Sequence, residues 1–154
     1  MAVYRHFSSG EALRASISQQ AREELARRMI KAISFENTLK NRFKATGRTY
    51  IQFALKEPGL FAVAFLACDE GPKREDNPSA WVVFHDSILD LCNAGLIEAN
   101  EVESVAAFAW STVHGYATLV AGNDPKRPKA NQNATESLLE RVWLGVVKER
   151  AETK

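Results

Sequence analysis

Residues 8–34 read SSGEALRASISQQAREELARRMIKAIS, and this stretch decides the fold. Charged residues fill most of one face of it, and apolar residues recur every three or four positions on the other. Ser8 and Glu11 form the Ser-x-x-Glu pattern of a capping box. This spacing predicts one long amphipathic helix with one face in a core. The apolar positions are Leu13, Ile17, Ala21, Leu25, Met29, Ile30 and Ile33.

Helical periodicity continues through the rest of the chain, without long strand-like alternation. Gly47 is expected to bend or break the second helix, and the third, apolar nearly all round, is expected to be buried. The capping pairs expected for the last three helices are Asn77-Pro78, Asn100 with Glu103, and Asn133 with Glu136. The sequence therefore predicts an all-α fold of about six helices, the later five at about 36–55, 60–68, 77–95, 101–121 and from 133 onward.

Size and composition indicate one ordinary domain. The chain has 154 residues, 45% hydrophobic and 25% charged, which suits a single core. Its longest apolar run, residues 60–68, is too short for a membrane helix, and no signal peptide is expected. Cys68 and Cys92 stand in apolar surroundings, which favours buried thiols in a reducing cytoplasm. We expect a cytoplasmic protein without a membrane partner.

Charge is unevenly distributed although the net charge is only +1. Residues 1–68 carry 11 basic and 5 acidic side chains, whereas residues 69–109 carry 2 basic and 9 acidic ones. A cationic first half suits contact with phosphate. Ordinary solvated helix faces explain the same distribution, so charge alone leaves both alternatives open.

The opening residues AVYRHFSSGEAL place Tyr4, Arg5 and His6 before Phe7, a serine turn and the capped helix. This resembles the end of the helix-turn-helix in TetR-family transcriptional regulators, whose recognition helix finishes in a Tyr-x-His-Phe pattern. There, Tyr and His at a helix end contact DNA phosphates and the Phe packs inside the small domain. The resemblance makes residues 1–7 a remnant of the DNA-binding domain and residues 8–154 the ligand-binding and dimerisation domain, with 8–34 as connector helix.

Two further segments strengthen the resemblance. FAWSTVHGYATLVAG, residues 108–122, is similar to the Trp-x-x-x-His-Gly signature of one class of TetR-family C-terminal domains, with Trp110, His114 and Gly115 as the matching residues. TYIQFALKEPGLFAVAF, residues 49–65, is similar to that class's Tyr-x-x-Phe-Ala…Pro-x-Leu segment. The three motifs follow in order and span nearly the whole chain.

Two departures concern DNA binding. Gly10 stands where the family usually has a phosphate-contacting Lys. The chain also begins inside the recognition helix, so we expect the rest of the DNA-binding head, roughly 40 residues, to be missing. Operator DNA is therefore an expected partner of the full-length regulator only.

The resemblance implies a small-molecule pocket enclosed by the connector helix and the next four helices. Aromatic walls with few polar groups favour a small hydrophobic or aromatic effector. Each aromatic residue, and each of the two histidines, is also explained as part of the core, His85 and His114 then being hydrogen-bonded to backbone or Tyr. The pocket residues expected are Tyr50, Phe53, Phe61, Phe65, Trp81, Phe84, His85, Ile88, Trp110 and His114.

Metal, cofactor and catalytic sites are not expected. The three histidines are scattered, with no Cys or carboxylate at ligand spacing. Phosphate-loop, nucleophile-elbow and His-Glu-x-x-His motifs are absent from the sequence. His85 and Asp86 point in different helical directions, which makes them a poor acid–base pair.

The resemblance also implies that the last two helices form a four-helix bundle with those of a second subunit. A self-complementary apolar stripe suits such a homodimer, although an intrachain core would need the same residues. The interface residues expected are Val105, Ala109, Val113, Ala117, Val120, Leu139, Val142, Trp143 and Val146.

Together these observations predict a ligand-responsive transcriptional regulator of the TetR type, a repressor, here without most of its DNA-binding head. The alternative is a stand-alone helical module that binds a small ligand or partner and never contacts DNA.

Overall fold

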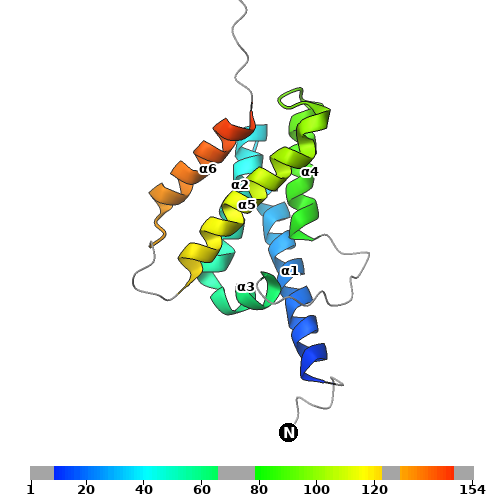
Figure 1. Cartoon of the computed structure of the whole chain (residues 1–154), viewed down its shortest axis with the longest axis vertical. Helices are drawn as coiled ribbons and strands as arrows, with labels where there is room; N and C mark the ends of the chain where they lie inside the picture. Colours follow the sequence, from blue (N-terminus) through cyan, green and yellow to red (C-terminus); the bar gives the residue numbers. More distant parts are fainter. Residues whose placement is uncertain (1–8, 66–78, 123–128, 148–154) are drawn as a thin grey trace, which may run out of the picture.

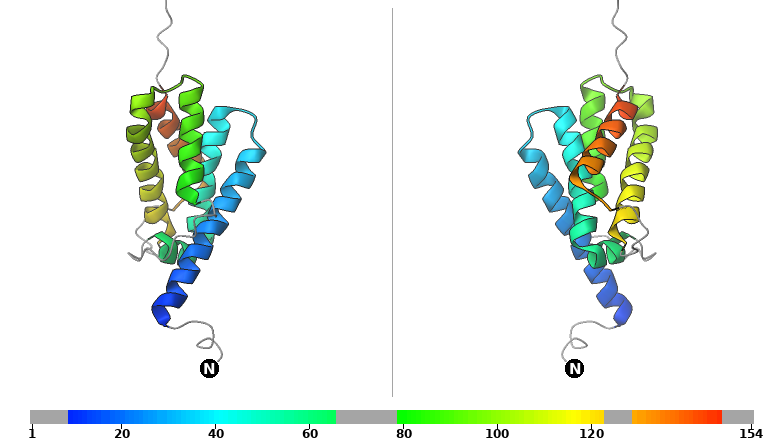
Figure 2. Two further views of the ribbon diagram at one scale, coloured as in Figure 1. Left: turned by 90° about the vertical axis from the view of Figure 1, so that its right-hand side faces the viewer. Right: turned by 90° about the vertical axis from the view of Figure 1, so that its left-hand side faces the viewer.

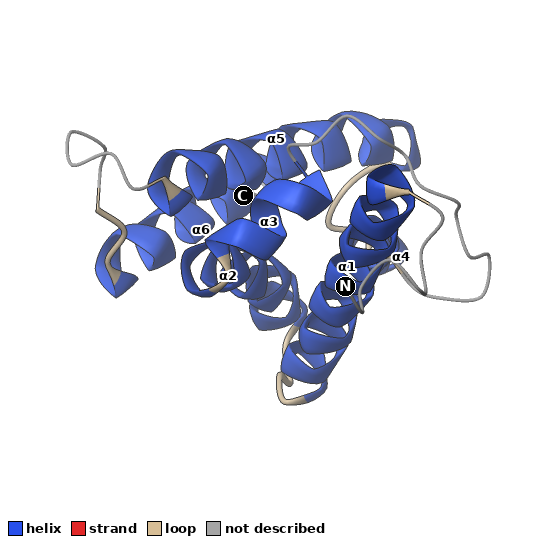
Figure 3. Ribbon diagram, turned by 90° about the horizontal axis from the view of Figure 1, so that it is seen from below, coloured by secondary structure: helices blue, strands red, loops and turns tan. Residues whose placement is uncertain are grey.

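The computed structural model describes residues 9–65, 79–122 and 129–147. Within these ranges every long element is an α-helix (Figure 3). The predicted all-α architecture is thereby confirmed. The elements are α1 (Gly10–Ser34), α2 (Leu39–Lys56), α3 (Pro58–Phe65), α4 (Ala80–Asn93), a 3₁₀ turn η2 (Ala99–Glu101), α5 (Val102–Ala121) and α6 (Gln132–Val146).

Helix α1 is the long connector-type helix that the sequence predicts. The Ser9 hydroxyl accepts a hydrogen bond from the Ala12 amide at 3.1 Å, so the cap lies one residue after the predicted Ser8, which is outside the described residues. Leu25 and Met29 are buried. Leu13 and Ile17 are only half-buried, because the first turns of α1 extend beyond the other helices (Figures 1 and 2).

Helix α2 is the centre of the bundle and contacts all five other α-helices. It continues without interruption past Gly47, contrary to the predicted bend or break. A Cβ at Gly47 would lie 2.6 Å from Cδ2 of Leu139 and 3.4 Å from Cγ2 of Val113. The glycine is therefore present because α5 and α6 approach the α2 backbone closely.

Helix α3 is less buried than its apolar sequence predicts. Phe61 and Ala64 face the core, whereas Leu60 is exposed. A hydrogen bond of 2.9 Å from Nε of Arg22 to the Ala64 carbonyl oxygen joins α1 to the end of α3. Cys68 lies outside the described residues.

The predicted helix starts need small corrections. Ser79 caps α4, whereas the predicted Asn77-Pro78 lies outside the described residues. At α5 the capping box is formed by Glu98 and Glu101 around η2, and at α6 the cap is Asn131, so the predicted Asn100/Glu103 and Asn133/Glu136 pairs were wrong. Gly95, with φ of 71°, ends α4 as predicted. Cys92 is half-buried and unpaired.

The described helices were compared with the requirements of a membrane-spanning segment and of a metal site. None of them is both long and apolar enough to cross a bilayer. Within the described ranges, no three His, Cys, Asp or Glu side chains gather as a metal ion would require.

Candidate functional site: an aromatic cage between five helices

The largest group of touching aromatic side chains lies where α2, α4 and α5 meet. Tyr50 of α2 is its centre, with ring centroids 5.1 Å from Trp110, 5.6 Å from Phe61 and 5.3 Å from Phe65. Offset and edge-on contacts at such distances stabilise aromatic groups beyond simple burial. Trp81 extends the group toward solvent, because its ring packs edge-on against Trp110 at 5.2 Å while 41% of the residue stays exposed.

The side chains around the centre of this group enclose a small space, and we call its lining the aromatic cage. About 10 Å³ of free space remains there, roughly the room needed by the centre of one water molecule. The cage is therefore closed in this conformation, and side chains must move before a larger molecule can bind. Its residues are Met29, Phe43, Thr46, Gly47, Tyr50, Phe84, Trp110, Val113, His114, Leu139 and Val142.

One pair of polar side chains points into the cage. The Tyr50 hydroxyl lies 2.8 Å from Nδ1 of His114. Burial raises the pKa of the Tyr50 phenol well above its usual value and lowers the pKa of His114. At neutral pH the phenol is thus protonated and the imidazole uncharged, and the tautomer of the imidazole sets which of the two donates. Tyr50 is buried and His114 half-buried, which fits the hydrogen-bonded core histidine expected as one alternative, while a ligand contact of His114 stays a prediction.

Four of the ten residues predicted for the pocket line the cage: Tyr50, Phe84, Trp110 and His114. Phe61 and Phe65 pack against Tyr50 and His114 from α3. Trp81 packs behind Trp110.

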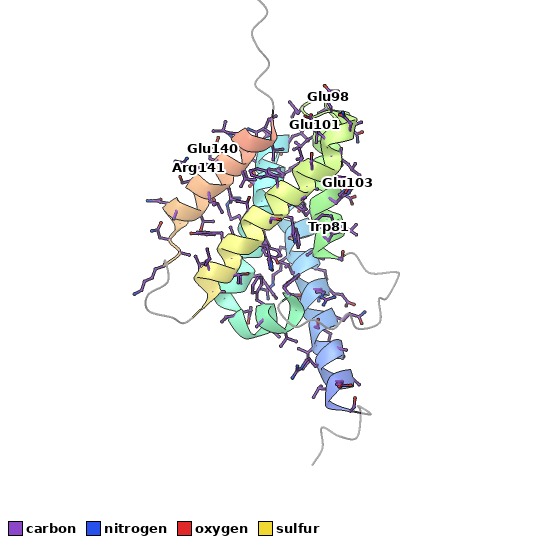
Figure 4. The ribbon with its side chains drawn as sticks, in the orientation of Figure 1. Trp81, Glu98, Glu101, Glu103, Glu140 and Arg141 are labelled. Carbon is purple, nitrogen blue, oxygen red and sulfur yellow. The ribbon has the colours of Figure 1, made fainter. Side chains whose placement is uncertain are left out.

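The other three predicted pocket residues do not line the cage, and a contact between them and a ligand stays a prediction. Phe53 lines a separate groove, where the Arg28 guanidinium carbon is 5.3 Å from its ring centre. Ile88 is buried in the core away from the cage lining. His85 is half-buried on α4, with Nε2 3.3 Å from the Glu103 carboxylate. Figure 4 places Glu103 near the start of α5, on the same side of the molecule as Trp81.

Sequence reasoning missed the smaller cage residues, although a signal for some of them exists. Phe43, Thr46 and Gly47 precede Tyr50 at seven, four and three positions, which puts them on one face of a helix. Tyr50 is the one residue of this face that the sequence analysis predicts for the pocket. Met29 is predicted only as one of the apolar residues by which the first helix packs on the core, without a link to the pocket.

The residues predicted for the dimer interface are mostly buried within the single chain, and the interface itself stays a prediction. Ala109, Val113, Ala117, Val120, Leu139, Val142 and Val146 are buried inside the chain, and Val105 and Trp143 are half-buried. Small residues let helices pack closely, and here they let α5 and α6 pack on α2. The seven buried side chains therefore form an intrachain core and cannot contact a second chain in this conformation.

Two open grooves lie outside the cage. One, of about 300 Å³ between α1 and α2, is lined by Phe35, Phe53 and three cationic residues, Arg28, Lys31 and Lys56. The other, of about 270 Å³, lies between α1, α2 and α4 beside Asp86 and Asp90. Both are separate from the Tyr50–His114 pair.

A family model described as "Tetracyclin repressor-like, C-terminal domain" matches residues 43–142. The chain belongs to the TetR family. The match begins at Phe43 and ends at Val142, so it contains every cage residue except Met29. TetR membership confirms the resemblance stated from the three sequence motifs. No curated protein and no solved structure gives a significant match. The predicted DNA-contact residues Tyr4, Arg5 and His6 lie outside the described residues.

Proposed function

We propose that this TetR-family chain is the effector-binding and dimerisation domain of a ligand-responsive transcriptional repressor that acts in the cytoplasm. The aromatic cage carries the proposal. It is apolar, contains one convergent polar pair and is shared by five helices, which suits a small hydrophobic or aromatic effector. Because the Tyr50–His114 pair is uncharged and surrounded by aromatic rings, we propose binding rather than catalysis.

The cage includes part of the connector helix, which provides the coupling. Met29 of α1 lines the cage, and Arg22 and Arg28 join the same helix to α3 and to Glu57 at the end of α2. An effector larger than a water molecule must displace cage side chains and thereby favour a different position of α1. The effect on DNA binding equals its difference in affinity for the two positions.

A second copy of this chain is the proposed partner, bound through the outer face of α5 and α6. Phe108, Leu119 and Leu144 are 46%, 52% and 61% exposed there. Exposed apolar residues gathered on one face mark association surfaces. A Cβ at Gly145 would lie 3.0 Å from Cε1 of Phe108, so the lack of a side chain at Gly145 leaves room for the Phe108 ring.

The dimer is tested by sedimentation velocity of Leu144→Asp and Phe108→Asp. Both side chains are exposed, so the single chain is expected to fold, and a shift from dimer to monomer is expected. Leu89→Asp on α4, where the side chain is 39% exposed, is the matched control and should stay dimeric. A wild-type chain that is monomeric at tens of micromolar would contradict this part of the proposal.

The regulatory role is tested with the regulator that includes its helix-turn-helix. Its binding to DNA upstream of its own gene is measured by electrophoretic mobility shift, with and without a compound that binds the cage. Release of DNA is expected, and crosslinking α1 of one subunit to α1 of the other should prevent that release. If crosslinked dimers still release DNA, coupling through the connector helix is wrong. If no form of the protein contacts DNA, the chain is the stand-alone binding module.

A further inference from the structure

The charge of the cage lining narrows the class of effector. None of its eleven residues carries a charge at neutral pH, given that His114 is neutral. We propose that the cage binds an uncharged, flat compound that has one hydrogen-bonding group and rejects analogues that carry a carboxylate group. This inference rests on the proposed effector-binding role.

Cations near the cage are already paired with other groups. Arg22 donates to the Ala64 carbonyl oxygen. Arg28 is bound by Glu24 and lies 3.7 Å from Glu57, and Arg42 lies 3.4 Å from Asp90. On the α6 side, Lys44 and Arg48 are bound by Glu136, and Lys44 also by Glu140. An anionic ligand in the cage would therefore find no cation to pair with among the described lining residues.

A buried charge without a partner loses its hydration and gains little in return. The corresponding loss of affinity, relative to an uncharged compound of the same shape, is about a hundredfold or more. The argument does not extend to an ammonium group, because the faces of aromatic rings such as Trp110 and Tyr50 attract cations. Selectivity against anions thus follows from the lining, whatever the exact shape of the ligand.

The polar part of the ligand has one place to bind. The Thr46 hydroxyl donates to the Phe43 carbonyl oxygen at 2.7 Å, within its own helix. The Tyr50 hydroxyl and Nδ1 of His114 share one hydrogen bond, and the hydroxyl keeps the capacity for one further hydrogen bond to a ligand. A phenol, alcohol or amide suits this position, since each can donate or accept, and one such bond changes affinity about two- to tenfold.

Access to this position runs along the aromatic side chains between α4 and α5. Trp110 lines the cage, and the half-exposed Trp81 packs against its edge. Figure 4 shows Trp81 at the start of α4, close to the outer surface. Movement of these two indoles opens the cage without breaking an ion pair.

The test uses four probes that share a para-tolyl group: p-cresol, toluene, 4-methylbenzoate and 4-methylbenzylammonium. Binding to the whole chain at pH 7 is measured by calorimetry, and in parallel to Trp110→Ala. Removing the indole leaves a cavity for a ring even where the native cage stays closed, since apolar cavities of this kind bind small aromatic molecules. Circular dichroism checks that each variant is folded.

We expect p-cresol to bind a few times more tightly than toluene and at least about a hundredfold more tightly than 4-methylbenzoate. The preference over 4-methylbenzylammonium should be smaller, because aromatic faces attract cations. A double variant, Tyr50→Phe with His114→Leu, should lose the preference for p-cresol over toluene. Lys31→Gln controls for binding of 4-methylbenzoate in the separate cationic groove. If binding of 4-methylbenzoate disappears in Lys31→Gln, the probe was bound in that groove, and the cage itself still selects against the carboxylate.

The remaining outcomes separate this inference from the proposed function. If 4-methylbenzoate binds as tightly as p-cresol, with Lys31→Gln unchanged, the inference is overturned and effector binding is left standing. Selective binding by Trp110→Ala but no binding by the native chain supports the charge selectivity and contradicts an effector role for p-cresol-sized compounds. Absence of binding to both proteins overturns the inference and the cage as an effector site.

Discussion

The aromatic cage and the α2–α6 seam are neighbours along α2 that share Gly47 and Leu139, but they are held together by different interactions. The seam joins Lys40, Lys44 and Arg48 of α2 to Glu136 and Glu140 of α6. Beneath these ion pairs, Gly47 lets Leu139 approach the backbone of α2. The cage has aromatic contacts and one neutral hydrogen bond instead.

This difference indicates which helices of the domain are able to move. Close packing at the seam tolerates little displacement, because interdigitated side chains have no free volume to move into. Aromatic contacts have several acceptable geometries of similar energy. We therefore expect α2 and α6 to stay fixed against each other, and α1, α3 and α4 to move when a ligand binds.

The largest effect is expected from emptying the centre of the cage. Tyr50→Ala removes a buried ring that touches Trp110, Phe61 and Phe65, which should lower the free energy of unfolding by about 3–5 kcal/mol. Urea denaturation measures this loss. Tyr50→Phe keeps the ring and should lose only about 1 kcal/mol. Equal losses in the two variants would mean that the hydroxyl, rather than the ring, stabilises the cage.

The next effect probes the close approach at the seam. Gly47→Ala introduces a methyl group against Leu139, and we expect a net loss of about 1–2 kcal/mol, since strain outweighs the gain in helix propensity. Gly59→Ala is the control, because nothing lies within 4 Å of its Cβ position, and it should be neutral or slightly stabilising. If both variants gain stability, α6 is not fixed against α2 as described.

A smaller effect concerns the ion pairs of the seam. The hydrogen bond from Arg48 holds the pKa of Glu136 below its usual value. A depressed carboxyl pKa contributes stability above the unfolded-state pKa of about 4.3, and that stability is lost as pH falls through the folded pKa. Glu136→Gln should cost at most about 1 kcal/mol at pH 7.

The pH dependence of that difference is the sharper measurement. Thermal unfolding at pH 7 and at pH 3 should show the gap between wild type and Glu136→Gln shrinking in acid, and high salt should shrink it as well. Asp86→Asn, at an exposed position of α4, serves as the surface control. A gap that is independent of both pH and salt would show that the seam is held by packing alone.

The smallest effect is expected in the pH dependence of stability, through His114 of the cage. Burial lowers the pKa of His114, so the unfolded chain binds a proton more readily than the folded one. The resulting stability is complete above the unfolded-state pKa of about 6.5 and is lost as pH falls below it. Unfolding midpoints between pH 7.5 and 5.5 should therefore decline less in His114→Gln than in wild type. Parallel declines would place the pH-sensitive group elsewhere.

The fold was predictable because helix periodicity and capping residues are local signals. The start of α4 at Ser79 and of α6 after Asn131 shifted by only a few residues from expectation. Which side of α5 packs inside the chain was not predictable, since α5 is apolar on two sides and periodicity does not tell which side packs on α2. Ala109 and Ala117 are buried within the chain, and the dimer interface stays a prediction.

The candidate site was predictable in its aromatic part only. Tyr50, Trp110 and His114 converge as expected, because large aromatic residues on amphipathic helices meet in the core. Met29, on the connector helix, and Leu139, on the last helix, reach the same place through tertiary packing. No local pattern in the chain indicates that helices so far apart in sequence share one space.

The projection of α1 beyond the other helices makes this helix a lever arm. Met29, its cage residue, and Gly10, its first residue, are separated by about 28 Å along the helix axis at 1.5 Å per residue. A tilt of about 5° with Met29 as fulcrum moves the start of the helix by about 2.5 Å. A ligand that tilts α1 by this angle would therefore move the far end of the helix much more than the turns beside the cage.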